Sequence, residues 1–235
     1  MKKEQITMQI TIVGTEDNMH TYEIMRSWAE NGRKGLILGL YPTLSLDRCT
    51  EYDLSTMHIM NHAKDFGWST VRIINLYSLV CEGKPETRKL LYDEDNLDYI
   101  EDLLEGPDIK EYDLVIATGS SLVKHMETIK IKLDILSMFC RKGLGNRLKY
   151  ISVGTGDDLI GAHPLFLGLH YGKTKWKLKD YPTEEIITCL KDEMKQKVKS
   201  AEIIAVEKVA KDRNKRKIDS GREERKNVSK DKKQA

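Results

Sequence analysis

Short apolar runs alternate with helix-like patterns along most of this chain of 235 residues, and this alternation limits its fold more than any other feature. Four runs are typical of strands covered on both faces, and they span residues 35–40, 71–79, 114–117 and 148–153. Three segments between them repeat apolar residues every three or four positions, and they span 53–66, 97–104 and 122–140. Strands that alternate with helices predict a mainly parallel sheet with helices on both faces, which is a three-layer α/β fold.

The N-terminal segments have a different pattern. Residues 6–12 alternate apolar and polar side chains, as a half-buried strand does. A turn at 14–18 and a second strand-like segment at 21–28 follow. We expect these two strands to pair as an antiparallel hairpin at the edge of the sheet. The sequence therefore predicts a single α/β domain over residues 1–182.

The C-terminal part has its own charge. Residues 195–235 hold 15 Lys+Arg against 7 Asp+Glu, a net +8, whereas residues 1–194 hold 24 against 30, a net −6. Helical spacing predicts an amphipathic helix over 183–210. Residues 211–235 hold too few aliphatic side chains to offset the entropy lost on ordering, so we predict a disordered basic tail. Such a tail either only improves solubility or contacts nucleic acid without sequence specificity.

Several classes of protein are disfavoured. The chain has no run of about 18 apolar residues and does not start with an apolar signal core, so we expect a cytoplasmic protein with no membrane partner. The closest cysteines, Cys49 and Cys81, are 32 residues apart, which excludes a zinc ribbon and favours reduced thiols. His58 and His62 could share a helical face, but the glutamate of a metalloprotease motif is absent. The sequence predicts no metal site and no cofactor.

Ligands of open α/β sheets bind at the carboxyl ends of the strands, so the residues that follow each strand are candidates for a site. Tyr41, held extended by Pro42, would point toward this edge, and Thr43 and Asp47 follow with a hydroxyl and a carboxylate. An ordinary proline turn is the alternative. Asp53 is expected to cap the next helix, and it lies close enough to this loop to serve as a catalytic carboxylate.

Two further strand ends carry polar or small residues. Asn75 lies in an apolar segment, where it needs hydrogen-bond partners, so it either binds the loop backbone or contacts a ligand. Gly119 and Ser120 lead from a strand toward a helix. They either cap that helix or offer backbone N–H groups to an anion. No Walker lysine follows them, so nucleoside triphosphate binding is not supported.

The last strand is followed by glycines without the GxGxxG spacing and by no clear helix, which disfavours a Rossmann dinucleotide site. His163, directly before Pro164, is the best single candidate for a catalytic residue. The pKa of histidine suits acid–base chemistry or a hydrogen bond to a developing anion. A surface histidine with no role is the alternative.

Taken in order, these motifs resemble an uncharacterised bacterial and phage family, domain of unknown function 1643, between about Thr21 and Leu178. The matching motifs are Leu40-Tyr41-Pro42-Thr43, Asp53-Leu54-Ser55, Phe66-Gly67-Trp68, Asn75-Leu76-Tyr77, Gly119 and His163-Pro164-Leu165-Phe166-Leu167. Tyr41 stands where that family has an asparagine, and Met57 and His58 stand where paired arginines are common.

The order of the motifs is also similar, more distantly, to that of uracil-DNA-glycosylase-like folds. In those proteins an early proline loop positions water, and a late His-Pro segment meets the base. The resemblance implies that the Tyr41–Thr43 loop and His163 flank a base. Tyr41 replaces the water-positioning residue, so ordinary glycosylase chemistry is not expected to carry over unchanged.

The sequence therefore favours a protein that binds a nucleobase, nucleotide or nucleic-acid element at the carboxyl edge of the sheet and hydrolyses an N-glycosidic or related bond. Tyr41 would stack on the ligand or hydrogen-bond to it, Asp47 or Asp53 would be the base, and His163 would stabilise the leaving group. An anion would lie near Gly119 and Ser120. The alternative is a non-enzymatic binding protein, such as a phage-type factor that contacts a host protein, because the acidic body is unlike a DNA-reading core.

Overall fold

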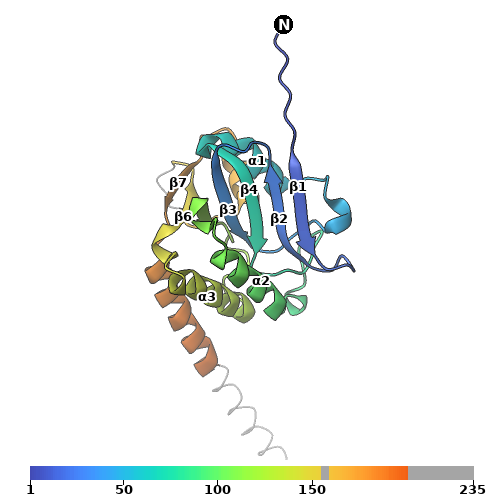
Figure 1. The fold of residues 1–235 in the computed structure, drawn as a ribbon. Helices are drawn as coiled ribbons and strands as arrows, with labels where there is room; N and C mark the ends of the chain where they lie inside the picture. Colours follow the sequence, from blue (N-terminus) through green and yellow to red (C-terminus); the bar gives the residue numbers. More distant parts are fainter. Residues whose placement is uncertain (155–158, 201–235) are drawn as a thin grey trace, which may run out of the picture. The chain divides into compact units, whose positions relative to one another are not determined.

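The computed structural model describes residues 1–154 and 159–200 and shows a seven-stranded mixed sheet with helices on both faces (Figure 1). The strands are β1 (Gln9–Gly14), β2 (Thr21–Ser27), β3 (Arg33–Gly39), β4 (Trp68–Asn75), β5 (Tyr112–Ile116), β6 (Leu148–Ser152) and β7 (Lys177–Asp180). The helices are α1 (Leu54–Phe66), α2 (Glu94–Glu105), α3 (Met126–Arg141) and α4 (Pro164–Tyr171), and residues 183–200 are also helical. The α/β fold predicted from the sequence is confirmed.

The sheet has the strand order β1-β2-β4-β3-β5-β6-β7. The four central strands β4, β3, β5 and β6 are parallel, so their carboxyl ends lie at one edge of the sheet. β1 and β2 form the predicted antiparallel hairpin, with Ile12 opposite Ile24. β2 also pairs antiparallel with β4, and β7 pairs antiparallel with β6. Because β2 runs opposite to β4, the β1–β2 turn lies near the same edge as the end of β4.

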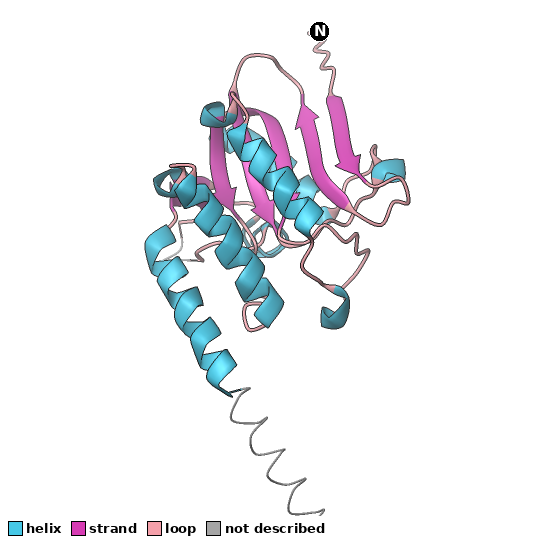
Figure 2. Cartoon of the chain, turned by 60° about the horizontal axis from the view of Figure 1, so that its bottom comes forward, coloured by secondary structure: helices cyan, strands magenta, loops and turns pink. Residues whose placement is uncertain are grey.

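Two hydrophobic clusters lie on the two faces of the sheet. Alternate residues of the parallel strands, such as Leu36 and Leu114, pack with α2 and α3 on one face (Figure 2). The intervening residues, such as Ile37 and Val115, pack with α1 and α4 on the other face. Continuous apolar runs are needed because both faces of the parallel strands are covered.

Two elements were not expected from the sequence. α4 follows His163 directly, with Pro164 in its first turn, where a proline costs no hydrogen bond. Its Gly168 lies against α1, because a Cβ atom there would meet the His58 ring at 2.0 Å. β7 is a short edge strand with the sequence KLKD, in which only Leu178 is partly buried. Its pairing with β6, and not a local hydrophobic pattern, makes it a strand.

Strand ends also differ from the expected positions. β1 begins at Gln9, because its partner β2 ends at Ser27, opposite Gln9, and leaves the preceding residues unpaired. β4 ends at Asn75 and not at Leu79. Beyond it, the backbone N–H of Leu76 donates to Gly39 O at 3.1 Å, so the chain leaves the ladder beside the end of β3.

The helix predicted from residue 183 is present as far as residue 200. Ile186, Ile187 and Leu190 on its first turns pack against the α2–α3 cluster. The predictions for 201–210 and for the basic tail at 211–235 lie outside the described residues. Within 1–154 and 159–200, no helix combines the length and the apolar character needed to cross a membrane.

Candidate functional site

A cavity of about 370 Å³ opens at the carboxyl ends of β3 and β4, on the face covered by α1 and α4. The loop after β3 lines it with Tyr41, Pro42 and Thr43, and the end of β4 contributes Asn75. The first turns of α1 and α4 complete the walls. Its volume is within the range of small-molecule sites, at the edge of the sheet where such folds bind ligands.

Most of the site residues predicted from the sequence meet in this cavity. Tyr41, Pro42, Thr43, Asp53, Asn75, His163 and Pro164 all line it, although they come from four separate segments. Gly119 lies behind the wall: a Cβ atom at this position would come within 2.8 Å of His163 Cβ.

Two predicted residues are not among those that line the cavity. Asp47 lies in the loop before α1, and its carboxylate accepts a hydrogen bond from Ser45 Oγ at 2.5 Å. Ser120 is exposed, and its neighbour Ser121 contributes to the wall instead. The structure therefore separates Asp47 from the candidate site and leaves Asp53 as the carboxylate that lines it.

One of the two backbone donors expected to bind an anion at Gly119 and Ser120 is already used by the chain. The backbone N–H of Gly119 donates to Gly161 O at 2.8 Å, so it is not free for an anion. The helix that was expected to start here, α3, begins only at Met126 and has His125 as its N-cap. Gly119 instead has a left-handed backbone (φ 69°), which lets the loop approach His163.

The Asn75 side chain is buried at the wall of the cavity, with 4% of its surface exposed. It follows Val71 and Ile73 on the α1–α4 face of β4. No hydrogen bond joins its amide to another described residue, and its amide atoms are not among the fully buried unpaired ones, so the amide is accessible from the cavity. Gly39 makes room for it, since a Cβ there would lie 2.5 Å from Asn75 Oδ1.

Asn96 in α2 hydrogen-bonds to the backbone of the loop after β4. This is a role that the sequence suggested for Asn75. The Asn96 Nδ2 donates to Asn75 O at 3.1 Å and to Leu76 O at 3.2 Å. The loop after β4 is therefore held from the α2 side, and the Asn75 amide is left for the cavity. Nothing in the local sequence around Asn96 distinguishes it from a surface helix residue.

His163 caps α4 and lines the cavity. Its Nδ1 accepts a hydrogen bond from Leu165 N at 3.3 Å. Burial lowers the pKa of His163 below its usual 6.5, and the Asp53 carboxylate opposes this in part. The ring is therefore neutral at pH 7, and because Nδ1 is an acceptor, its proton is on Nε2. His163 provides one uncharged N–H donor.

Asp53 caps α1, as the sequence predicted. Its Oδ1 accepts from Thr56 N at 2.9 Å, and its Oδ2 accepts from Thr56 Oγ1 at 2.7 Å. Each carboxylate oxygen can accept a second hydrogen bond, so Asp53 can still receive a donor from the cavity. Thr43 Oγ1 is buried and, among the described residues, also lacks a hydrogen-bond partner.

Two aromatic side chains contribute to the walls, Tyr41 from the loop after β3 and Phe166 from α4. Burial, with a smaller effect of Cys81, raises the pKa of Tyr41, so its hydroxyl stays protonated at neutral pH. Phe166 is 42% exposed and Leu169 of α4 is 66% exposed, so the rim of the cavity is apolar. These rim residues were not singled out in the sequence, although Phe166 is part of the motif that starts at His163.

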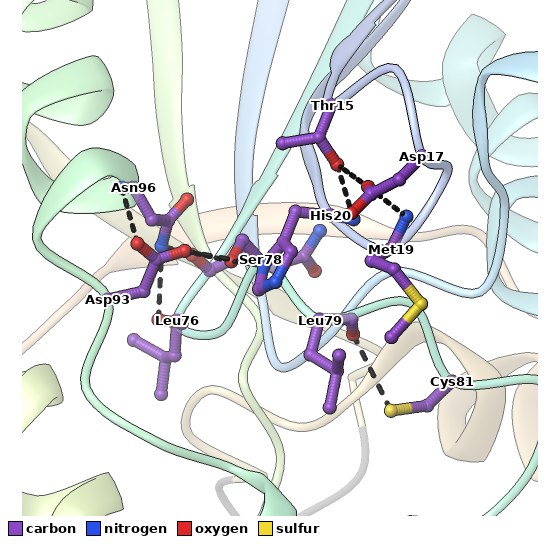
Figure 3. A network of polar contacts seen from close by, with 11 residues as sticks. Thr15, Asp17, Met19, His20, Leu76, Ser78, Leu79, Cys81, Asp93 and Asn96 are labelled. Carbon is purple, nitrogen blue, oxygen red and sulfur yellow. Dashed lines mark hydrogen bonds and ion pairs between the residues drawn. The ribbon is translucent and has the colours of Figure 1, made fainter.

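A polar network that includes His20, Ser78 and Asp93 holds the loop after β4 (Figure 3). Ser78 Oγ, almost fully buried, donates to Asp93 Oδ2. His20 Nδ1 lies 2.7 Å from Ser78 Oγ and 3.5 Å from Asp93 Oδ2. Because Ser78 gives its only proton to Asp93, His20 must donate to Ser78. This Ser–His–Asp set therefore links three segments and is not a nucleophile with its base.

The histidines of α1 are packing residues. His62 stacks on Trp176 with ring centroids 3.9 Å apart, and its Nδ1 lies 2.9 Å from Asp65 Oδ2. His58 packs against Gly168 of α4. Within the described part of the chain, no three His, Cys, Asp or Glu side chains are grouped so as to hold a metal ion.

Comparison with known proteins adds no further constraint: no protein-family model, curated protein or solved structure matches this chain. The resemblance of its ordered motifs to domain of unknown function 1643 stays a prediction from those motifs.

Proposed function

We propose that this protein binds a nucleobase-bearing ligand in the cavity at the ends of β3 and β4. The observation that carries the proposal is the Asn75 amide, which lines the cavity and makes no hydrogen bond to another described residue. An asparagine amide offers one donor side and one acceptor side, which match the paired donor and acceptor on the edge of a base. A ligand that supplies both would replace the hydrogen bonds that the amide otherwise makes to water in the cavity.

The rest of the wall suits the same ligand. The rings of Tyr41 and Phe166 provide apolar faces on which a planar base can stack. Thr43 Oγ1 supplies another hydrogen-bonding group without a partner in the described chain. A cavity of about 370 Å³ holds a base with part of its sugar.

We further propose hydrolysis of an N-glycosidic bond as the reaction. The C–N bond breaks, its electron pair stays on the base, and the neutral His163 Nε2–H stabilises the charge that develops there. Water adds to the sugar carbon, and Asp53, as general base, accepts its proton. This proton then passes through water to the base, so the products are the free base and the free sugar, and water is the only co-reactant.

Thermal shift with free bases and nucleosides tests the binding step, because a specific ligand raises the melting temperature by mass action. We expect a shift with the wild type and with Asn61→Ala, an exposed asparagine of α1, and none with Asn75→Leu. Chromatography of the free base tests the reaction, and His163→Ala should lose it while still folding. If no base or nucleoside shifts the wild type, the proposal is wrong.

A protein partner is the second candidate, and exposed apolar side chains beside the cavity favour it. Leu54 and Met57 of α1 and Phe166 and Leu169 of α4 are all exposed, and the two helices pack together. Replacing Leu54 and Met57, which are not among the lining residues, with serine would weaken protein binding and leave the shift with nucleosides unchanged. Loss of the nucleoside shift in that variant would speak against this separate role.

A further inference from the structure

The polar side chains among the described lining residues are hydroxyls, one amide, two histidines and one carboxylate. None of the described residues that line it is a lysine or an arginine. Asp53 is the one carboxylate among these residues, and His163 is neutral at pH 7 because burial lowers its pKa. A charged phosphate inside these walls would lose water and find no cation to replace it.

Some of the backbone donors at the cavity are already used. Both helices that begin there have a capped first turn: Thr56 N donates to Asp53 Oδ1, and Leu165 N donates to His163 Nδ1. Pro164, the first residue of α4, has no N–H to offer. In the loop after β5, Gly119 N donates to Gly161 O and is not available either. Helix N-termini bind anions through free N–H groups, and here a side chain of the same chain accepts from one N–H of each helix.

Part of the rim is apolar. Phe166 and Leu169 of α4 are exposed there and offer apolar surface, beside the polar side chains of Ser121 and His170. Asp53 would repel an anion held within a few ångströms in this partly buried site.

We infer that the cavity selects uncharged ligands, namely free bases and nucleosides, and rejects their 5′-phosphates. This inference rests on the proposed function and narrows its substrate class. Asn75 and the aromatic walls would recognise the base, and the single carboxylate among the described lining residues, Asp53, would exclude the phosphate.

Calorimetric titration of the full chain tests the inference with matched pairs, each a nucleoside and its 5′-monophosphate. We expect the monophosphate to bind roughly tenfold more weakly or worse. Titrations at 0.15 M and 0.5 M salt separate this effect from phosphate binding by the basic C-terminal residues, which high salt screens.

Two charge variants sharpen the test. Asp53→Asn removes the charge and keeps the cap, because asparagine caps a helix as well as aspartate does. This variant should reduce the difference in binding affinity between the nucleoside and its monophosphate. Asp47→Asn makes the same change of charge outside the cavity lining, so it should leave this difference in affinity unchanged.

The outcomes distinguish the two proposals. Equal binding of nucleoside and monophosphate by the wild type at both salts overturns the selectivity and leaves base binding standing. If Asp53→Asn and Asp47→Asn change the difference in affinity equally, Asp53 is not the cause of the selectivity, and that part of the inference is wrong. If neither ligand of any pair binds, the proposed function fails and the selectivity fails with it.

Discussion

Lys132 of α3 is the residue whose replacement has the best-defined effect on stability. Its Nζ donates to Thr118 Oγ1 at 3.1 Å, and it has no carboxylate partner among the described residues. Burial lowers the pKa of Lys132 from 10.5 to about 8. Each pKa unit corresponds to about 1.4 kcal/mol, so the charged amine destabilises the fold by about 3 kcal/mol at pH 7.

Lys132→Met should therefore stabilise the protein at pH 7. The lost hydrogen bond to Thr118 offsets about 1 kcal/mol, which leaves a gain of about 2 kcal/mol. For a domain of this size the melting temperature should rise by about 4–8 °C. Lys130→Met is the matched control: it changes an exposed lysine of the same helix, whose amine lies 3.9 Å from the Tyr92 ring centre.

The gain depends on pH in a defined direction. The folded-state pKa of Lys132 is below its unfolded value, so its penalty is complete below pH 8 and disappears as pH rises from 8 to 10.5. Urea unfolding of both proteins at pH 7, 8, 9 and 10 measures the difference. The assignment of a buried amine without a carboxylate partner is wrong if Lys132→Met is less stable than the wild type at pH 7. It is also wrong if the difference in unfolding free energy between the two proteins does not decrease above pH 8.

Three further variants test the site by stability. Asn75→Leu should change the free energy of unfolding by less than about 1 kcal/mol, because its amide has no protein partner in the described chain. Asn96→Ala should lower the free energy of unfolding by about 2 kcal/mol, because it removes two hydrogen bonds. Equal losses for the two variants in urea unfolding would contradict this. Gly119→Ala should lower the free energy of unfolding by about 2–4 kcal/mol, because a close contact with His163 adds to the strain of a positive φ. Gly143 has a similar φ and open space around it, so Gly143→Ala should lower the free energy of unfolding by only about 1–2 kcal/mol. A similar melting temperature for both variants would refute the close contact. The stability that neutral His163 contributes is present above pH 6.5 and is lost as pH falls through its lowered pKa. His163→Asn can still cap α4, so the unfolding midpoint of this variant should fall less than that of the wild type between pH 6.5 and 4.5. Midpoints that fall in parallel for the two proteins would argue against this.

The sequence alone was sufficient for the parts of this protein that depend on local patterns. Continuous apolar runs indicated the four parallel strands, since strands covered on both faces have no polar side to display. Strict alternation indicated the β1–β2 edge hairpin. The Asp53 cap could be predicted because its donor, Thr56 N, lies only three residues away. The general place of the site also followed, because parallel strands share one carboxyl edge.

The tertiary structure decided what the individual site residues do, because their partners are distant in the sequence. Asn75 is free for a ligand only because Asn96, on α2, binds the loop backbone in its place. Gly119 was expected to bind an anion, but the approach of His163 makes it a packing glycine. α4 forms where no helix was expected, with its Gly168 closely packed on His58 of α1. Hydrophobic periodicity records which face of an element is buried, but not which side chain of a distant segment lies against it.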